Sequence, residues 1–439
     1  MFGKQEIAVL STKSTKTITA TKVIDSSVKN GRIVFDNPKI FSFEFDKDVI
    51  SGDVTLEKVD GNTRVKAKTT TLFDKKQATV TLAGNLERDI SYEFTIDNIK
   101  AQDTSSLASK YKLGFTSSDG PIVISTGIDN ISAPLTRTIT LAFDQTLQAD
   151  QDITNFVSTT GIPTTITRLD NQVFVRYVNA PMCTDLNISI KPGLLSNNNI
   201  IQNDPWSFST RTVCHATSII GYSVLGRPIL SYTFGSGGTT ILFTGGIHGS
   251  EPSGSYMMYD FISYLESNAK KIPADKKIVI VPEVNPDGIA TFSRYNSNNV
   301  NIDRNFPSAS WTPDIDISSG LVMDGGGSSA LSEPETRALA DLTTSLQPRL
   351  EVSFHAQGSL IGANQLGDSV TIGNMYALSV GYNSMIGQAE ETMGYTITGE
   401  YEEWAGEKYG TPAILIELPT STGRYFWAHQ SILWGIVNI

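Results

Sequence analysis

The stretch Ile241–Gly254, ILFTGGIHGSEPSG, joins an apolar run to a histidine and a glutamate. The run is continuous, as expected for a strand of a parallel sheet that is buried on both faces. Two glycines, Gly245 and Gly246, allow close backbone approach, and His248 and Glu251 then follow three residues apart. Because the chain has only four histidines, one of them at the end of a buried strand requires an explanation.

Apolar runs alternate with predicted helices from residue 213 onward. The runs are TTILFTGGI, KKIVIVPEV, LEVSFHA and TPAILIEL, and the predicted helices include PSGSYMMYDFISYLES (252–267) and SEPETRALADLTTSLQ (332–347). The second helix begins with a predicted capping box, Ser332 and Glu335, with Pro334 in its first turn. This alternation predicts an α/β domain with a mixed, mostly parallel sheet.

Polar residues lie at the carboxyl ends of these strands, where sites form in open α/β sheets. His248 and Glu251 follow the first strand, and NPDG (Asn285–Gly288) follows the second. His355 ends the third strand and Glu417 ends the fourth. Two histidines and a glutamate form a plausible catalytic zinc set that leaves the fourth position for water. The sequence therefore indicates His248, Glu251 and His355 as metal ligands.

A simpler interpretation of the first pair is also open. A His-x-x-Glu pair occurs by chance, so that His248 could be a hydrogen-bonded core histidine. Glu251 could then be a helix N-terminal charge favoured by the helix dipole. The two glycines before the pair favour the metal site, since they permit close backbone approach.

Taken in order, these motifs resemble the zinc metallocarboxypeptidases of the carboxypeptidase A type. GGIHGSEPSG is similar to the first zinc motif of the family, and RYNSNNVNIDRNFP (Arg294–Pro307) resembles its arginine-containing substrate motif. VSFHAQG carries the second histidine, and TPAILIELP carries the catalytic glutamate. GYSVLGRPI and the compact domain look most like the bacterial branch that hydrolyses the bond between γ-D-glutamate and a diamino acid in peptidoglycan stem peptides.

The resemblance implies a role for each matching residue. His248, Glu251 and His355 would bind Zn²⁺. Glu417 would be the general base that takes a proton from the activated water and passes it to the leaving amine. Arg294 would stabilise the oxyanion of the tetrahedral intermediate. The simpler alternative for Arg294 and for Glu417 is a charged side chain at the surface.

Other matching residues would bind the substrate. Arg304 would hold a substrate carboxylate with its planar fork, and Asn305 belongs to the same motif. Tyr395 lies nine residues before Trp404, and Glu417 lies thirteen after it, as do the mobile tyrosine, the tryptophan and the glutamate of the family. Tyr395 would cap the bound substrate, unless it is an ordinary surface tyrosine.

Two residues near the substrate depart from the family pattern. The usual Asn-Arg-Asn is Asp303-Arg304-Asn305 here, and Asp303 would partly neutralise Arg304 and favour an ammonium group. Glu402 occupies the position that usually lies at the base of the specificity pocket, where enzymes that take basic residues carry an acid. Alternatively, Glu402 belongs to a solvated run of glutamates. Diaminopimelate, which presents an ammonium and a carboxylate, would suit Asp303, Arg304 and Glu402 together.

Residues 1–212 alternate apolar and polar residues in short segments, which predicts β-sandwiches. The pattern repeats, because FSFEFDKDV and ITLAFDQTL match as strands followed by aspartate. The whole resembles the bacterial Ig-like domains of surface-layer and secreted proteins. We predict Ig-like sandwiches over residues 1–117 and 118–212, and a zinc carboxypeptidase-like catalytic domain over residues 213–439. The Ig-like domains would attach the protein to a cell-envelope surface or act as spacers.

Composition limits the partners and the compartment. With 45 acids against 34 bases and a net charge of −11, a nucleic-acid or anionic-membrane partner is disfavoured, and we expect no transmembrane segment. The N-terminus, MFGKQEIAVLSTKSTK, has no signal-peptide apolar core. The protein is therefore either intracellular or secreted after removal of a signal, and a wall-peptide substrate favours secretion. Cys183 and Cys214 are either unrelated thiols or a disulfide.

Three functions remain open from the sequence. The first is a zinc-dependent peptidase of bacterial cell-wall peptides. The second is a secreted carboxypeptidase that removes C-terminal basic residues from peptides. The third is a surface adhesion or structural module with an inactive peptidase fold. The intact set of predicted ligands and catalytic residues disfavours the third function.

Overall fold

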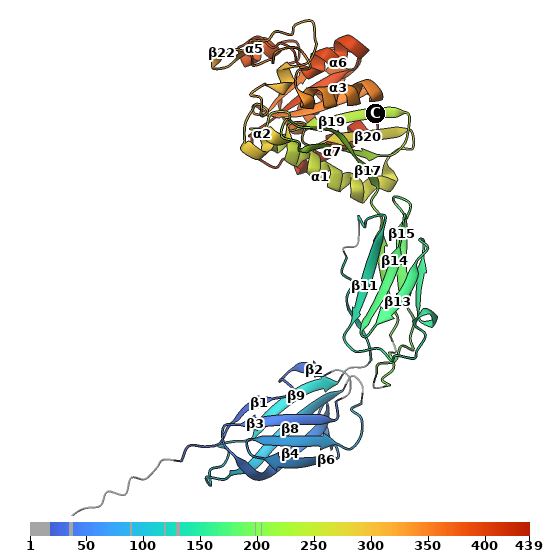
Figure 1. The fold of residues 1–439 in the computed structure, drawn as a ribbon, viewed down its shortest axis with the longest axis vertical. Helices are drawn as coiled ribbons and strands as arrows, with labels where there is room; N and C mark the ends of the chain where they lie inside the picture. The colour runs from blue at the N-terminus through green and yellow to red at the C-terminus, as the bar shows by residue number, and fades with distance from the viewer. Residues whose placement is uncertain are drawn as a thin grey trace, which may run out of the picture. The chain divides into compact units, whose positions relative to one another are not determined.

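The computed structural model describes residues 18–34, 38–87, 90–117, 120–128, 132–197, 199–202 and 204–439. This part of the chain divides into two compact units (Figure 1). The first unit contains most of the chain before residue 210, and it is built from strands. The second contains Thr210–Ile439 together with two short segments that precede it, 132–135 and Ala180–Asp185.

The described part of residues 23–117 forms two sheets around one apolar core. The strand orders are β1-β3-β7-β6 and β2-β9-β8-β4-β5. Apolar side chains alternate with polar ones, so that each strand buries one face; in β8, for example, Tyr92, Phe94 and Ile96 are buried. The bounds are β1 Val23–Ser26, β2 Arg32–Val34, β3 Ile40–Phe45, β4 Val49–Asp60, β5 Thr63–Lys66, β6 Thr69–Asp74, β7 Gln77–Leu82, β8 Ser91–Ala101 and β9 Tyr111–Ser117.

Two further sheets follow, in the orders β10-β11-β14-β13 and β12-β15-β16. Their bounds are β10 Val123–Ser125, β11 Arg137–Phe143, β12 Val157–Thr160, β13 Thr165–Leu169, β14 Gln172–Tyr177, β15 Asp185–Ile190 and β16 Trp206–Arg211, with a short helix η1 at Ile153–Asn155. The predicted β structure of this half is confirmed. Its Ig-like character and the domain boundaries stay predictions.

The second unit is built on a mixed sheet with the order β17-β18-β20-β19-β23-β26-β24-β25. Strands β20, β19, β23 and β26 are mutually parallel, whereas β17, β18 and β24 join antiparallel. The predicted mixed α/β sheet is therefore confirmed. The bounds are β17 His215–Tyr222, β18 Pro228–Phe234, β19 Thr239–Gly245, β20 Lys276–Val281, β23 Leu350–Ala356, β24 Leu360–Ala363, β25 Asn383–Ser384 and β26 Ala413–Leu418.

Helices cover both faces of this sheet (Figure 1). Helices α1, α4 and α7 share a core with Ile241 and Phe243 of β19, and α3 and α6 share another with Leu242. Successive strand residues thus feed opposite cores, which is why the strand is apolar throughout. The bounds are α1 Pro252–Asn268, η2 Ala269–Lys271, α2 Pro286–Thr291, η3 Ile302–Arg304, α3 Pro334–Leu346, α4 Ser369–Val380, α5 Ala389–Met393, α6 Tyr401–Tyr409 and α7 Phe426–Val437, with a hairpin of β21 Ile315–Ile317 and β22 Gly320–Val322. No helix in the described residues is long and apolar enough to cross a membrane.

The capping box predicted for α3 is wrong. Pro334 begins the helix as expected, but the N-cap is Glu333, without a side-chain capping hydrogen bond. The carboxylate of Glu335 is buried and accepts hydrogen bonds from Val224 N and Asn296 Nδ2, both at 3.0 Å. These tertiary partners take the place of the local cap.

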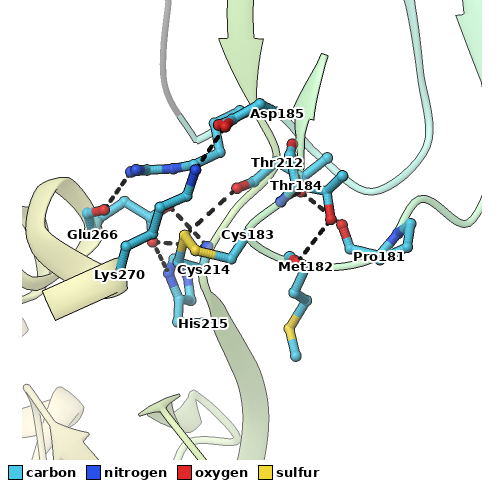
Figure 2. Close-up of a disulfide and its surroundings, with 11 residues drawn as sticks. Pro181, Met182, Cys183, Thr184, Asp185, Thr212, Cys214, His215, Glu266 and Lys270 are labelled. Carbon is cyan, nitrogen blue, oxygen red and sulfur yellow. Dashed lines mark hydrogen bonds and ion pairs between the residues drawn. A yellow bond between two sulfur atoms is a disulfide. The ribbon is translucent and has the colours of Figure 1, made fainter. Parts of the chain in front are cut away.

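Cys183 and Cys214 form a disulfide (Figure 2). Beside it, the buried carboxylate of Glu266, near the end of α1, accepts from Cys214 N at 2.8 and 3.1 Å. The same carboxylate lies 2.8 Å from Nδ1 of His215. The disulfide is thus tied to the carboxyl end of α1, and His215 has a structural role there.

Removing the disulfide should lower the free energy of unfolding by about 3–4 kcal/mol, because the bond constrains a loop of 31 residues in the unfolded chain. Urea unfolding curves of the wild type and of the Cys183→Ser/Cys214→Ser double variant would measure this change through tryptophan fluorescence. Wild type treated with a reductant serves as the control and should match the double variant. Superimposable curves for the oxidised wild type and the variant would contradict the prediction.

His429 in α7 is buried between two tyrosines. Its Nδ1 lies 2.7 Å from the hydroxyl of Tyr376, and its Nε2 lies 2.9 Å from that of Tyr382. Burial lowers the pKa of His429 to about 4. A neutral ring can accept from one hydroxyl and donate to the other, so the histidine is stable here without a charge.

This histidine should make the fold less stable in acid. The folded-state pKa lies below the unfolded value, so the unfolded chain takes up the proton first as pH falls. The resulting stability is complete above about pH 6.5 and falls by up to roughly 3 kcal/mol by pH 4. His429→Gln cannot titrate, and its free energy of unfolding should fall less steeply over that range. Buried carboxylates contribute equally to both proteins, so equal slopes would contradict the assignment.

Candidate active site

His248 and Glu251 lie in the turn between β19 and α1. Glu251 is the N-cap of α1, and its N–H donates to the carbonyl of His248 at 3.1 Å. The turn depends on glycine, because a Cβ at Gly245 would lie 2.7 Å from the carbonyl oxygen of Gly254, and Gly246 has a φ of +62°. The two glycines noted in the sequence therefore allow the turn that brings the pair together.

Three donor atoms converge at this end of the sheet. Nδ1 of His248 lies 3.2 Å from Nδ1 of His355 and 3.3 Å from Oε2 of Glu251, and the last two atoms are 3.7 Å apart. All three side chains are buried. Ligand bonds of about 2.0–2.1 Å place the corners of a zinc tetrahedron roughly 3.3 Å apart. The donor spacing therefore fits a zinc ion.

Asp303 offers a second combination. His248, Asp303 and His355 can each supply one ligand atom with all three atoms within 4.8 Å. However, Oδ2 of Asp303 lies 3.7 Å from Nε2 of His248, the ring nitrogen that does not face Glu251, and Oδ1 of Asn301 lies 3.0 Å from the same nitrogen. We therefore propose Glu251 as the third ligand. Asp303 and Asn301 would orient the His248 ring, as outer partners of metal-bound histidines do.

Glu417 lies beside the donors in a neighbouring strand. It pairs in parallel register with His355, and its side chain is buried. Burial raises the pKa of Glu417 to about 7, although His355 and Arg294 oppose the rise. Its Oε2 has no hydrogen-bond partner within the described chain. A buried carboxylate with a free oxygen and a pKa near neutrality suits a general base.

Arg294 and Tyr395 reach the same place from different segments. Arg294 donates to Oε1 of Glu251 at 2.8 Å and is only partly buried. Arg294, Tyr395 and Glu417 line one small cavity together with His248 and His355. The structure thus brings the predicted catalytic pair, the predicted ligands and Tyr395 together.

A larger cavity of about 490 Å³ adjoins the small cavity at the donors, and we name it the acidic pocket. It shares Met385, Ile397, Glu400 and Leu415 with the cavity at the donors. Its acidic lining consists of Glu390, Glu400, Glu402, Glu403 and Glu407. No lysine or arginine lines it in the described part of the chain, so the pocket favours a cation.

Glu402 is 4% exposed, so it is not part of a solvated charge run. Its carboxylate accepts from the hydroxyl of Ser353 in β23, and its Oε2 is unpartnered among described residues. Burial raises the pKa of Glu402. Burial and the charge of Glu402 also raise the pKa of Glu400 to about 8. A cation entering the pocket would relieve this crowding of negative charge.

Arg304 is already paired. Its NH1 donates to Oδ2 of Asp303 at 2.5 Å and lies 4.0 Å from Oε1 of Glu400, and the side chain is buried. Asn305 is buried and bonded to the backbone. Its Nδ2 donates to the carbonyl oxygens of Gly326 and Ser329 at 2.7 and 2.8 Å, which indicates a structural rather than a substrate-binding role.

Sequence reasoning missed three residues around the site. Asn301 lies within the arginine-containing motif, two positions before Asp303, but its sequence position gave it no role. Ser353 and Glu351 were hidden in an apolar strand. Glu351 is fully buried, accepts from the Thr244 hydroxyl at 3.2 Å, and has a pKa raised well above its usual range by burial. Polar residues at alternate positions before His355 were the available signal.

The ligand assignment predicts different losses of zinc affinity. Glu251→Gln removes a ligand, whereas Asp303→Asn removes an outer partner and should weaken binding by no more than about a hundredfold. Competition with a chromophoric chelator would measure both affinities. Glu417→Gln is the matched control and should keep its affinity. If Asp303→Asn lost more affinity than Glu251→Gln, the His248, Asp303 and His355 group would be the zinc site instead.

Comparisons with known proteins agree with this site. A family model described as zinc carboxypeptidase matches residues 212–434, half of the chain. Murein peptide amidase A of Escherichia coli (strain K12) is 31% identical over 148 residues, 32% of this chain and 58% of that protein. Carboxypeptidase SOL1 of Arabidopsis thaliana is 28% identical over 125 residues, 27% of this chain and 23% of that protein. The matched segments therefore cover less than two thirds of the length of either relative.

A solved structure of murein-tripeptide amidase from Escherichia coli O157 is 24% identical, with a TM-score of 0.38, over 51% of this chain and 90% of that one. The family assignment rests on the match across residues 212–434, which includes the three donors and Glu417. The chain belongs to the zinc carboxypeptidase family.

Proposed function

We propose that this chain hydrolyses the amide bond between γ-D-glutamate and diaminopimelate in peptidoglycan stem peptides. The observation that carries the proposal is the acidic pocket beside the Asp303–Arg304 pair. Family membership supports peptide-bond hydrolysis. The names of two relatives, murein peptide amidase A and murein-tripeptide amidase, support a wall peptide.

The leaving residue would occupy the acidic pocket. Its ammonium group would be held by Glu402, and by Glu400, which lies 4.0 Å from Arg304. Its carboxylate would approach Arg304, whose charge is offset by Asp303. A residue with both charges fits this arrangement. An ammonium alone would leave Arg304 without a substrate carboxylate, and a carboxylate alone would leave the glutamates of the acidic pocket without a cation.

The chemistry would be divided among the residues at the donors. Zinc, held by His248, Glu251 and His355, would polarise the scissile carbonyl and acidify a water. Glu417 would accept the proton of the attacking water and donate it to the leaving amine. Arg294 would stabilise the negative charge that develops on the carbonyl oxygen. Tyr395 would cap the bound substrate.

A second candidate is a carboxypeptidase that removes C-terminal lysine or arginine from peptides. The acidic pocket also favours this activity, since a long basic side chain would fill it. The pairing of Arg304 with Asp303 disfavours it, because a terminal carboxylate then meets a compensated arginine. Under either candidate we place the protein outside the cell or at its envelope, with the β domains as Ig-like spacers or attachment modules.

Paired digestions by the zinc-loaded protein would test the proposal. One substrate is a stem peptide with a γ-D-glutamyl-diaminopimelate bond, and the other is a blocked dipeptide ending in arginine, with products identified by mass spectrometry. We expect cleavage of the first only. Cleavage of the second only would favour the carboxypeptidase, and Glu417→Gln is the inactive control for both.

Glu402→Gln should reduce kcat/KM for the diaminopimelate substrate by about ten- to a hundredfold, because it leaves the ammonium unpaired in a buried pocket. Asp303→Asn should shift preference toward a leaving residue with a carboxylate alone. The distal variant Glu407→Gln, whose carboxylate accepts from Ala309 N at 2.9 Å, is the matched control and should have a smaller effect. Unchanged preference in the first two variants would contradict the assignment.

A further inference from the structure

We propose that the β21–β22 hairpin is the wall that limits the acyl side of the substrate, so that the enzyme accepts short peptides. This inference rests on the proposed placement of the leaving residue in the acidic pocket. The hairpin belongs to none of the motifs that indicated the activity.

Three cavities follow one another through the site. The acidic pocket meets the small cavity at the donors through Glu400 and Leu415. That small cavity meets a third, of about 250 Å³, through Arg294, Tyr395 and Glu417. We name the third the hairpin cavity, because Ile317 and Ser318 form part of its lining.

This order of cavities assigns the ends of the substrate. The scissile bond must lie at the donors, between the acidic pocket and the hairpin cavity. With the leaving residue in the acidic pocket, the acyl part has to extend into the hairpin cavity. There it meets Arg294, Gln357, Ser318 and Tyr395, which offer donors to a peptide, and the apolar Met393.

The hairpin is held at its base. Ile315 is buried, Nε1 of Trp311 donates to the carbonyl oxygen of Gly326 at 3.1 Å, and Asp324 N donates to Oδ1 of Asp314 at 2.9 Å. Ile317 and Ser318 of the hairpin line the same cavity as Met393, the last residue of α5. An anchored hairpin facing a helix makes a defined wall rather than a passing loop conformation.

The size of the cavity sets the limit on the acyl part. Its volume of about 250 Å³ lies below the roughly 300–1,000 Å³ of pockets for drug-sized ligands. Ile317 of the hairpin lines this cavity, so a longer acyl chain would have to pass it. We therefore expect released stem peptides to be better substrates than long chains with the same leaving residue.

Cysteine labelling tests the placement without turnover. The two native cysteines are bonded, so Ser318→Cys would introduce a single free thiol, and the exposed neighbour in Ser319→Cys, which does not line the cavity, is the matched control. A short acyl product ending in γ-D-glutamate, at saturating millimolar concentration, should slow alkylation several-fold in the first variant only. Diaminopimelate should slow neither. No slowing by the acyl product, or slowing by diaminopimelate alone, would overturn the proposal.

A shortened hairpin tests the limit itself. Replacing residues 316–321 with Asn-Gly keeps the Ile315–Val322 pair and supplies a two-residue turn. We compare kcat/KM for two substrates with the same leaving residue and either a short or an extended acyl part. The wild type should prefer the short one by at least about tenfold, and the shortened variant should lose most of that preference while keeping its zinc content and melting temperature. An unchanged ratio would overturn the proposal.

The two failures can be told apart. If the wild type cleaves neither substrate, the proposed function fails, and the labelling result still decides whether the hairpin contacts the acyl product. If the wild type cleaves both equally well, the proposed function stands and the hairpin is not a wall.

Discussion

The convergence of two imidazole nitrogens and a carboxylate oxygen within 3.2–3.7 Å of one another is the constraint on which the rest of the catalytic unit depends. Such a group is costly to bury unless a cation binds it. Parallel pairing brings the carboxyl ends of β19, β23 and β26 to the same edge of the sheet, which places His248, His355 and Glu417 together. The apolar strands therefore serve as a rigid support. Because they are buried on both faces, they fix the positions of the donor atoms.

Negative charge distinguishes the neighbouring pocket. Glu402 and Glu351 each keep one carboxylate oxygen without a partner in the described chain, although both side chains are buried. Natural folds rarely leave buried polar groups unsatisfied, and the exceptions gather at functional sites. Glu402 faces the acidic pocket, so a bound ammonium would supply its missing partner. Glu351 lies deeper, and its raised pKa allows it to remain as a neutral acid. A bound cation would therefore stabilise the buried Glu402 carboxylate, whereas protonation stabilises that of Glu351.

The sequence was most informative where local pattern and tertiary structure agree. Continuous apolar runs predicted β19, β20, β23 and β26, and the residues after them predicted the donors. It failed where a distant partner overrides a local preference, as when Glu335 bonds Val224 and Asn296 in place of a helix cap. It was silent about Asn301 and Ser353, since a side-chain partner across the fold leaves no periodic signal. The disulfide stayed undecided for the same reason, because separation along the chain does not give distance.

Helix α1 connects the two most constrained places in the unit. Its N-cap, Glu251, faces the donors, and Glu266 near its other end binds Cys214 N and His215 beside the disulfide. A helix rises about 1.5 Å per residue, so the two ends are roughly 25 Å apart. Sites at such a separation contribute almost independently to stability. The disulfide region therefore acts on how firmly the unit is folded, whereas under the proposed function the donors, the acidic pocket and the hairpin would determine which bond it hydrolyses.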